Sequence, residues 1–559
     1  MDKAQLVDWG KNLDIESLIQ AYGSPAWIVS EAQLKENVAH IESFTGATQR
    51  IFYPVKTNPS LSVLQLLALM QVGADCASRA EIDLACLAGM QYSTISYNSP
   101  AQDVELCKML LENGARVVMD DPEAILALDR IIQPSEMKGR LILRLNLADY
   151  GAYTEKKANQ ELMAHGHTSS KFGIPVEDLE ALLAKISLPV SGLHVHVGTQ
   201  MDNLRSFEDA LHQMHDWASR LLQLGQHIQE INIGGGLGIP FTAADNFPSL
   251  KAWSDALVHL KKTHFTYFVE PGHALVGNAV ALLMQVQTIK NSRGKKWAIT
   301  DVGTDQLTKI TLLRWPHRIL SASGAELPAG NDAVAGPLCF TGDTLLENVS
   351  VAGLEKGSPL LLTEAGAYTY SLANRFNGRL APQWLVLHSN GTIVQTLRKE
   401  DRFENLQLAN YAWPAMETDS EPQPVSIQKV HQLSSGYLRE SSAEDSFSYV
   451  SMVKTAYCTY AFEVLTASAV DFISMPFAIR ILGDASIVSV LHHEGFETKQ
   501  QSVWGRRLVM DCFGQVPANA KFQFTLSLSD TIKAADYTTR LLRFQSACGK
   551  CVGSFVVVY

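Results

Sequence analysis

The chain has 559 residues, of which 46% are hydrophobic and 18% are charged, and its formal net charge is −11. This composition provides apolar material for packed cores and excludes a mostly disordered protein. The acidic balance argues against a partner that binds through phosphates, so we expect no nucleic-acid partner. Every apolar run is too short to cross a bilayer, and Met1–Gln5 shows no basic, apolar leader. We therefore expect a cytoplasmic protein without a membrane partner.

The first 270 residues alternate strand-like and helical patterns. The apolar, strand-like runs lie at Arg50–Val55, Arg116–Met119, Leu141–Leu145, Gly192–Val197, Glu230–Ile233 and Phe265–Val269. The amphipathic, helical patterns lie at Ser60–Gln71, Asp121–Ile131, Val176–Ile186, Ser206–Leu224 and Leu250–Lys261. Repeated strand-then-helix units of this spacing predict an α/β fold, a (β/α)8 TIM barrel over residues 26–275. We expect residues 1–25 to pack on the domain that follows the barrel.

Strand-like runs follow one another without long helices from about Gly277 to Leu408. They predict a mainly antiparallel β domain, a β-barrel or sandwich over residues 276–416. A stretch rich in proline, serine and acidic residues, Glu417–Pro424, predicts a linker over residues 417–428. Residues 429–559 are β-patterned, and Lys521–Asp530 alternates apolar and polar residues. We interpret this C-terminal β-rich domain as a β-sandwich that serves oligomerisation, carrier docking or substrate capping.

Several chemically versatile residues lie at or just beyond the ends of predicted barrel strands, where loops build active sites. They are Lys56, His196, the Gly234–Gly236 triplet and Glu270. A lysine amine can bind an aldehyde covalently, and a bare glycine loop can surround a phosphate. A carboxylate can hold a pyridine nitrogen in its protonated form. The combination indicates pyridoxal phosphate as the cofactor, and we expect no metal.

Nine short stretches carry a resemblance to a known family. They are Tyr53–Pro59, Asp75–Ile82, Ser170–Ile174, His194–Gln200, Asn232–Gly238, Glu270–Gly272, Gly336–Asp343, Gly366–Thr369 and Phe376–Gly378. In this order, the chain resembles the alanine-racemase-fold (fold type III) pyridoxal-phosphate decarboxylases that act on diaminopimelate, ornithine, arginine and related amino acids. The resemblance covers roughly residues 22 to 406.

The resemblance implies a role for each matching position. Lys56 would bind the cofactor covalently, His196 would stack on its ring, and Glu270 would bind the ring nitrogen. Cys339 would act as a general acid and reach across a dimer interface, so the resemblance implies a homodimer with shared active sites. The other cofactor contacts that it implies are Arg144, Thr199, Gly234, Gly235, Gly236, His273 and Tyr368.

Two departures from the family pattern affect the predicted ligands. His273 stands where the family usually has an arginine. A histidine can donate a hydrogen bond, but it lacks the permanent charge and the bidentate donor geometry of a guanidinium group. Phe340 stands where related enzymes carry an acidic residue for the distal ammonium of the substrate. The predicted substrate-binding residues are Asp305, Lys309, Phe340 and Asp343. An unpaired, buried ammonium costs several kcal/mol. The predicted substrate is therefore an amino-acid derivative with an acylated, amidated or carrier-linked distal end, in a siderophore-like or polyamine-like pathway.

Three functions remain open at this point. The first is decarboxylation of an amino acid to the amine. The second is racemisation or epimerisation, although racemases of this fold place an arginine at the ring nitrogen, whereas this chain has Glu270. The third is a non-catalytic, cofactor-binding or scaffold protein. The C-terminal domain could also recruit a carrier protein or a pathway enzyme.

Overall fold

The computed structural model contains two compact units, residues 1–400 and residues 401–559, and each is described by itself. The structure describes residues 2–6, 8–147, 170–313, 315–400 and 423–434, and residues 445–558 with gaps at 457–458, 469–472, 474, 497–503, 513–519, 529–531, 534–537 and 548–550. Residues 417–422 of the predicted linker therefore lie outside the described residues. Among the helices that are described, none is long and apolar enough to span a membrane.

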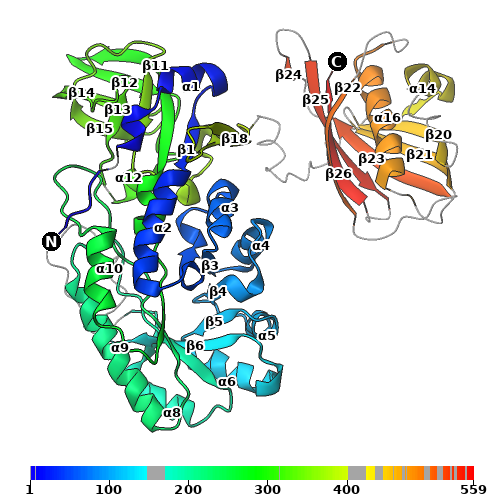
Figure 1. Ribbon diagram of the computed structural model, residues 1–559. Coiled ribbons are helices and arrows are strands. Elements are labelled where there is room, and N and C mark those ends of the chain that lie inside the picture. Colours follow the sequence, from blue (N-terminus) through cyan, green and yellow to red (C-terminus); the bar gives the residue numbers. More distant parts are fainter. Residues whose placement is uncertain are drawn as a thin grey trace. The chain divides into compact units, whose positions relative to one another are not determined.

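Eight parallel strands form the predicted barrel in the first unit, and helices surround them (Figure 1). The last strand meets the first through an Ile51–Val269 bridge, in which the Phe52 N–H donates to the Val269 carbonyl over 2.8 Å. This contact closes the sheet and confirms the (β/α)8 architecture. The strands are β2 (Phe52–Pro54), β3 (Gly73–Cys76), β4 (Ile95–Asn98), β5 (Arg116–Met119), β6 (Arg140–Asn146), β8 (Val190–His194), β9 (Glu230–Asn232) and β10 (Thr266–Phe268). A two-residue strand, β7 (Ile174–Pro175), adds to β6.

The barrel helices begin where a short polar side chain caps the first turn. Ser30, Ser78, Asp103 and Ser249 each accept a hydrogen bond from a backbone N–H three residues later. Such caps satisfy N–H groups that have no partner inside the helix, so they fix the starting points of helices. The helices are α2 (Glu31–Thr45), α3 (Leu61–Leu69), α4 (Arg79–Leu87), α5 (Val104–Glu112), α6 (Pro122–Ile131), α8 (Leu179–Leu183), α9 (Arg205–Gln223), α10 (Leu250–Val258) and the short α11 (His273–Val276).

A second sheet of nine strands, all but β1 later in sequence than the barrel, is mainly antiparallel, as the sequence predicts, and contains two parallel pairs. The parallel pairs are β1 with β17 and β12 with β14. The strands are β1 (Ala26–Ser30), β11 (Val280–Ser292), β12 (Lys295–Thr300), β13 (Ile319–Ser321), β14 (Ala329–Ala335), β15 (Thr344–Val349), β16 (Pro359–Leu362), β17 (Gln383–Leu387) and β18 (Ile393–Leu397), with helix α12 (Thr308–Leu313) between β12 and β13. Strand β1 lies between β11 and β17. The first strand of the range predicted for the barrel therefore belongs to the second sheet.

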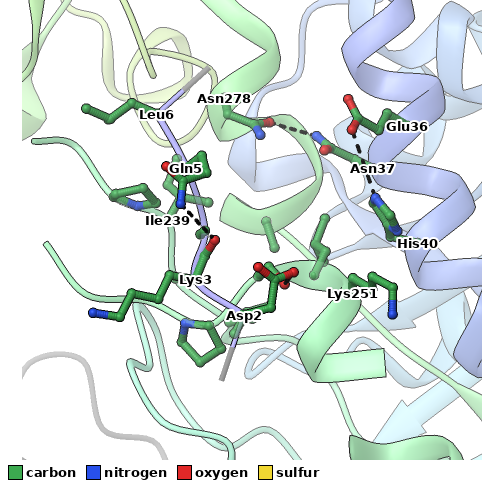
Figure 2. A pocket seen from close by; sticks show the side chains of 18 of the residues that line it. Asp2, Lys3, Gln5, Leu6, Glu36, Asn37, His40, Ile239, Lys251 and Asn278 are labelled. Carbon is green, nitrogen blue, oxygen red and sulfur yellow. Dashed lines mark hydrogen bonds and ion pairs between the residues drawn. The ribbon is translucent and has the colours of Figure 1, made fainter. Parts of the chain in front are cut away.

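The first 25 residues divide between the barrel and the second sheet. Helix α1 (Ile15–Tyr22) packs on the second sheet through Ile15 and Leu18. Residues 2–4 instead run along a barrel loop, where the Ala4 N–H donates to the Phe247 carbonyl over 2.9 Å. Figure 2 shows the pocket of about 300 Å³ that this segment forms with α2 and with the loop that follows β9.

The second unit is a single antiparallel sheet that packs on one buried helix, not the β-sandwich that the sequence predicts. The strands lie in the order β19-β20-β21-β23-β25-β26-β22, and β24 pairs with β25. The elements are β19 (Gln423–Val425), α14 (Ile427–Leu433), β20 (Asp445–Ala456), β21 (Thr459–Ser468), α16 (Met475–His493), β22 (Trp504–Cys512), β23 (Lys521–Leu528), β24 (Ile532–Lys533), β25 (Thr538–Ser546) and β26 (Cys551–Val558). Residues Ile481–Leu491 of α16 are all buried. A helix that is buried over this length belongs in a core, and its buried Asp484 carboxylate accepts hydrogen bonds from the hydroxyls of Ser434 and Tyr449. Its many β-branched residues are typical of a strand in the sequence.

Each unit has its own hydrophobic core, so we expect a chain that ends at Asn410 to fold by itself. Its circular dichroism spectrum and its thermal unfolding transition should be those of a folded α/β protein, because the core of the first unit uses no residue of the second. Aggregation of the truncated chain under conditions in which the full chain is monodisperse would contradict this expectation.

A substitution inside α16 should destabilise the second unit alone. The Leu482 side chain is fully buried in that core, and truncation to alanine removes its packing contacts. We expect Leu482→Ala to lower the free energy of unfolding of the second unit by about 2–5 kcal/mol. The transition assigned to the first unit with the truncated chain should stay at the same temperature, as measured by calorimetry.

Candidate active site

A cavity of about 380 Å³ lies where the carboxyl ends of the barrel strands meet the second sheet. Seven of the residues that the sequence assigns to the cofactor line it, from four barrel strands or the segments directly after them and from the segment after β16. Lining residues are Lys56, Ala77, Asn98, Pro100, Arg144, Phe172, His196, Thr199, Glu270, His273, Leu313, Trp315, Tyr368 and Leu372. The tertiary structure therefore brings together side chains that are up to 316 residues apart in sequence (Lys56 to Leu372).

Lys56 follows strand β2 and faces a buried carboxylate. Its Nζ lies 3.6 Å from Oδ2 of Asp75, which is 1% exposed on the neighbouring strand β3. Burial is the largest influence on the pKa of Lys56 and lowers it, but the charges of Asp75, Tyr368 and Glu270 together raise it by more, so the net pKa lies above the ordinary value. Burial, with the nearby Glu270, raises the pKa of Asp75 to about 8. Neither Asp75 oxygen makes a hydrogen bond within the described residues, so the lysine is its main partner.

Glu270 is held from both sides by residues of neighbouring strands. Its Oε2 lies 3.0 Å from Nε2 of His194, and its Oε1 accepts a 2.7 Å hydrogen bond from Nδ2 of Asn232. Burial opposes ionisation of this 3%-exposed side chain, but His194, Lys56 and Asn232 together outweigh burial and hold its pKa below the ordinary value. The carboxylate is therefore charged and fixed in direction at the mouth of the barrel.

The Gly234–Gly236 loop packs too tightly for any side chain. A Cβ on Gly235 would lie 2.0 Å from the Glu270 carbonyl oxygen, and Gly234 and Gly236 have φ of +65° and +120°. The Gly235 N–H donates to Nδ1 of His196 over 3.0 Å, which fixes the orientation of that imidazole ring. The Gly234 N–H donates to Oδ1 of Asn232 over 2.8 Å. The N–H groups of Gly234 and Gly235 are thus engaged with side chains, and the three glycines allow close approach of the loop; their binding to the cofactor stays a prediction.

The structure also contains polar atoms that lack partners and can receive a ligand. Nε2 of His273 and Oγ1 of Thr57 are buried and make no hydrogen bond within the described residues. A Cβ on Gly272 would lie 2.8 Å from that Thr57 oxygen and 3.6 Å from the Tyr368 hydroxyl. A group with several acceptor oxygens, such as a phosphate, fits these donors. The residues present are therefore compatible with pyridoxal phosphate.

The predicted substrate-binding residues and the predicted general acid do not line this cavity. Asp343 is a structural residue, because its carboxylate accepts hydrogen bonds from the backbone N–H groups of Thr304 and Leu338, each over 2.7 Å. Burial raises the pKa of Asp305, which accepts from the Gly303 N–H. The other three are separate from the cavity in different ways: Lys309 is fully buried beside it, and Cys339 and Phe340 are exposed.

Sequence reasoning missed several residues of the site. Asp75 and Asn232 lie inside family-like motifs, but their function depends on which strands are neighbours. His194 reads equally well as a core histidine, and the structure places it on Glu270. The apolar wall residues Phe172, Leu313, Trp315 and Leu372 carry no sequence signal that separates them from ordinary core residues.

Comparisons with known proteins agree with this geometry. Residues 31–277 match the family described as "Pyridoxal-dependent decarboxylase, pyridoxal binding domain". The chain is 29% identical to the diaminopimelate decarboxylase of Helicobacter pylori strain J99 over 405 residues, which cover 70% of this chain and 96% of that protein. The structure of diaminopimelate decarboxylase from Methanocaldococcus jannaschii with L-lysine matches at a TM-score of 0.63 and 25% identity, over 71% of this chain and 94% of that chain.

A lysine decarboxylase from Selenomonas ruminantium shares the fold at a TM-score of 0.57 and 24% identity, over 66% of this chain and 94% of that chain. The first unit thus has the pyridoxal-binding domain of this decarboxylase family over residues 31–277, and it shares its fold with these amino-acid decarboxylases. Pyridoxal phosphate is its cofactor, and decarboxylation of an amino acid is its reaction.

The Lys56–Asp75 pair makes a prediction about pH. In Asp75→Asn the carboxylate that raises the pKa of Lys56 is absent while burial still lowers it, so the amine becomes neutral at lower pH. We expect the rate at which Lys56 captures pyridoxal phosphate, followed by visible absorbance, to reach its maximum at a lower pH than in the unmodified chain. Asp83→Asn, on the exposed side of α4, is the matched control. An unshifted pH profile in Asp75→Asn would refute the coupling.

Proposed function

We propose that the protein decarboxylates an α-amino acid whose distal end carries no free charge. The apolar wall of the cavity carries this proposal. Phe172, Leu313, Trp315 and Leu372 face the space that cofactor-binding residues leave. Among the described residues that line the cavity, Glu270 is the one carboxylate, and in this proposal it binds the ring nitrogen of the cofactor.

The cost of a distal ammonium decides against diaminopimelate and free lysine. Burying an ammonium without a partner costs several kcal/mol, and the Arg144 guanidinium in the same wall adds repulsion. An acylated or amidated end instead gains from the apolar contact, by about 1–3 kcal/mol for each fitting group. The substrate is therefore a modified amino acid, of the kind that siderophore-like or polyamine-like pathways use, and a carrier-linked end meets the same requirement.

The residues of the site divide the work in a definite way. Bound pyridoxal phosphate supplies an electron sink for the pair left on Cα when carbon dioxide leaves. Lys56 binds the cofactor covalently. When the substrate amine replaces the Lys56 amine on the cofactor, Lys56 exchanges a proton with Asp75 beside it. Glu270 keeps the ring nitrogen protonated, and His196 supports the ring from one face. The role of Arg144, Thr199, His273 and Tyr368 is to position the cofactor.

The position of Cys339 supports a shared active site. Its side chain is exposed, and its N–H donates to Oδ1 of Asn377 over 2.8 Å, in a loop that does not line the cavity of its own chain. Phe340, next to it, is 49% exposed and packs edge-to-face on Phe376. An exposed cysteine and an exposed aromatic pair are suited to cover the cavity of a second copy. We therefore propose a homodimer in which Cys339 of one subunit protonates Cα in the other.

The second unit has a separate role in this proposal. The curated relatives and solved structures above cover about 70% of the chain, and they align with the first unit. Recruitment of a carrier protein or of another pathway enzyme through residues 429–559 remains a prediction. A pull-down with the isolated first unit as the reference tests it.

Substrate preference is the direct test of the proposed function. With a panel of free and distally acylated L-amino acids, we expect carbon dioxide release to favour the acylated forms by at least about tenfold in kcat/KM, because the ammonium penalty exceeds 1.4 kcal/mol. Leu313→Glu places a carboxylate in the wall and should shift the preference toward free lysine. Leu312→Glu, on a side chain that is 60% exposed outside the cavity, is the matched control. Equal rates on free and acylated substrates would reject the proposal.

Subunit mixing tests the shared site. Lys56→Ala and Cys339→Ala chains should each be inactive, the first without visible absorbance from bound cofactor. Mixed subunits should recover part of the activity, because one of their two sites then has both residues intact. Absence of recovery, with exchange verified by native mass spectrometry, would place Lys56 and Cys339 in the same subunit.

A further inference from the structure

An aromatic enclosure surrounds His273 at one end of the cavity. The ring of His273 lies 4.9 Å from that of Tyr368, 5.8 Å from Trp315 and 6.5 Å from Phe241, measured between ring centroids. The side chain is 4% exposed, and its Nε2 has no hydrogen-bond partner within the described residues. This nitrogen is thus a buried polar atom, in the wall of a ligand cavity, that needs a partner.

The same enclosure contains a second cationic group, Lys309 on helix α12. Its Nζ lies 4.6 Å from the ring centre of Phe241 and 5.6 Å from that of Trp315, and it donates a 2.7 Å hydrogen bond to the Ala367 carbonyl. Ala367 directly precedes Tyr368, whose ring contacts His273. Lys309 and His273 therefore contact the same short segment of the second sheet domain. The Lys309 side chain is fully buried, and no carboxylate pairs with it within the described residues.

We propose that His273 and Lys309 together form the anion anchor of this site, with His273 in contact with the cofactor phosphate and Lys309 behind it as the second positive charge. The unpartnered Thr57 hydroxyl and the Tyr368 phenol, which converge on Gly272, complete the set of donors. This anchor replaces a permanent guanidinium by two groups that can lose their protons. Cofactor retention therefore becomes sensitive to pH.

The charges that face the anchor determine the direction of this dependence. Burial, followed by the charge of Lys309, keeps the pKa of His273 well below 6.5 in the absence of an anion. Burial lowers the pKa of Lys309 to about 7 and that of His317 to about 3, and Nδ1 of His317 lies 3.0 Å from the Thr363 carbonyl. A phosphate dianion, whose second pKa is about 6, stabilises the protonated forms of His273 and Lys309. Binding is thus coupled to proton uptake and weakens as pH rises through 7.

The comparison of two cofactor forms isolates the phosphate contribution. The dissociation constants of pyridoxal and of pyridoxal phosphate are measured by fluorescence with the full chain between about pH 6.5 and 8.5. We expect the ratio of the pyridoxal constant to the pyridoxal phosphate constant to fall as pH rises. The fall should reach up to about tenfold per pH unit for each proton that is taken up on binding. His273→Gln should weaken pyridoxal phosphate by about 10- to 100-fold and leave pyridoxal within about twofold. Lys309→Met should act in the same direction with a smaller effect.

The double variant H273R/K309M replaces the titrating pair by one permanent charge. It should bind pyridoxal phosphate as tightly as the unmodified chain and give a flat ratio across the same pH range. His317→Gln is the matched control, because it removes a neighbouring imidazole that is neutral at these pH values. Circular dichroism of the apoproteins checks that each variant folds.

Two outcomes would overturn the anchor. One is a His273→Gln chain that loses pyridoxal and pyridoxal phosphate equally, which would indicate a structural role. The other is an unchanged affinity for pyridoxal phosphate with a raised KM for the amino acid, which would assign His273 to the substrate carboxylate. Both outcomes leave the proposed decarboxylation of an uncharged-end substrate untouched, because that proposal depends on the lack of a free carboxylate among the described residues that line the cavity, and neither His273 nor Lys309 supplies one.

Discussion

A buried carboxylate that must stay ionised organises this active site. Glu270 is 3% exposed, a position in which a lone carboxylate would be neutral, and His194 and Asn232 supply the compensation. The three residues come from the ends of neighbouring parallel strands β8, β9 and β10. Closure of the barrel between Ile51 and Val269 keeps these strand ends in register. Electrostatics at the reaction centre therefore depends directly on the hydrogen-bond ladder of the sheet.

The rest of the cavity follows from this arrangement. Glu270 is held by His194 and Asn232, so the described residues of the cavity wall include no free carboxylate for a cationic end of the substrate. Apolar residues from the barrel and from the second sheet domain line the remaining wall. The buried Lys309 and His273 lie among aromatic rings in the same region. Charge is thus concentrated where the cofactor binds, and the remaining surface selects its ligand by shape and by the exclusion of charge.

Much of this could be read from the chain alone, because local patterns encode it. The alternation of strands and helices predicted the barrel, and Lys56, His196 and Glu270 were identified from their places after strands. The errors have physical causes. Strand β1 precedes the barrel helices in sequence but pairs with β11 and β17. Helix α16 was missed because a helix that is buried over most of its length and rich in β-branched residues lacks the amphipathic period. Asp343 resembled a ligand-binding residue, yet its carboxylate is used by its own loop.

The sequence by itself therefore determined the barrel class, the cofactor and the side chains that can carry its chemistry, since each depends on residue type and on position along one strand or loop. Only the tertiary structure decided which of these side chains meet. The pairing of Asp75 with Lys56, the clamp on Glu270 and the joint enclosure of His273 and Lys309 all link segments that are distant in sequence. Such contacts depend on strand order and packing, which no local pattern of residues specifies.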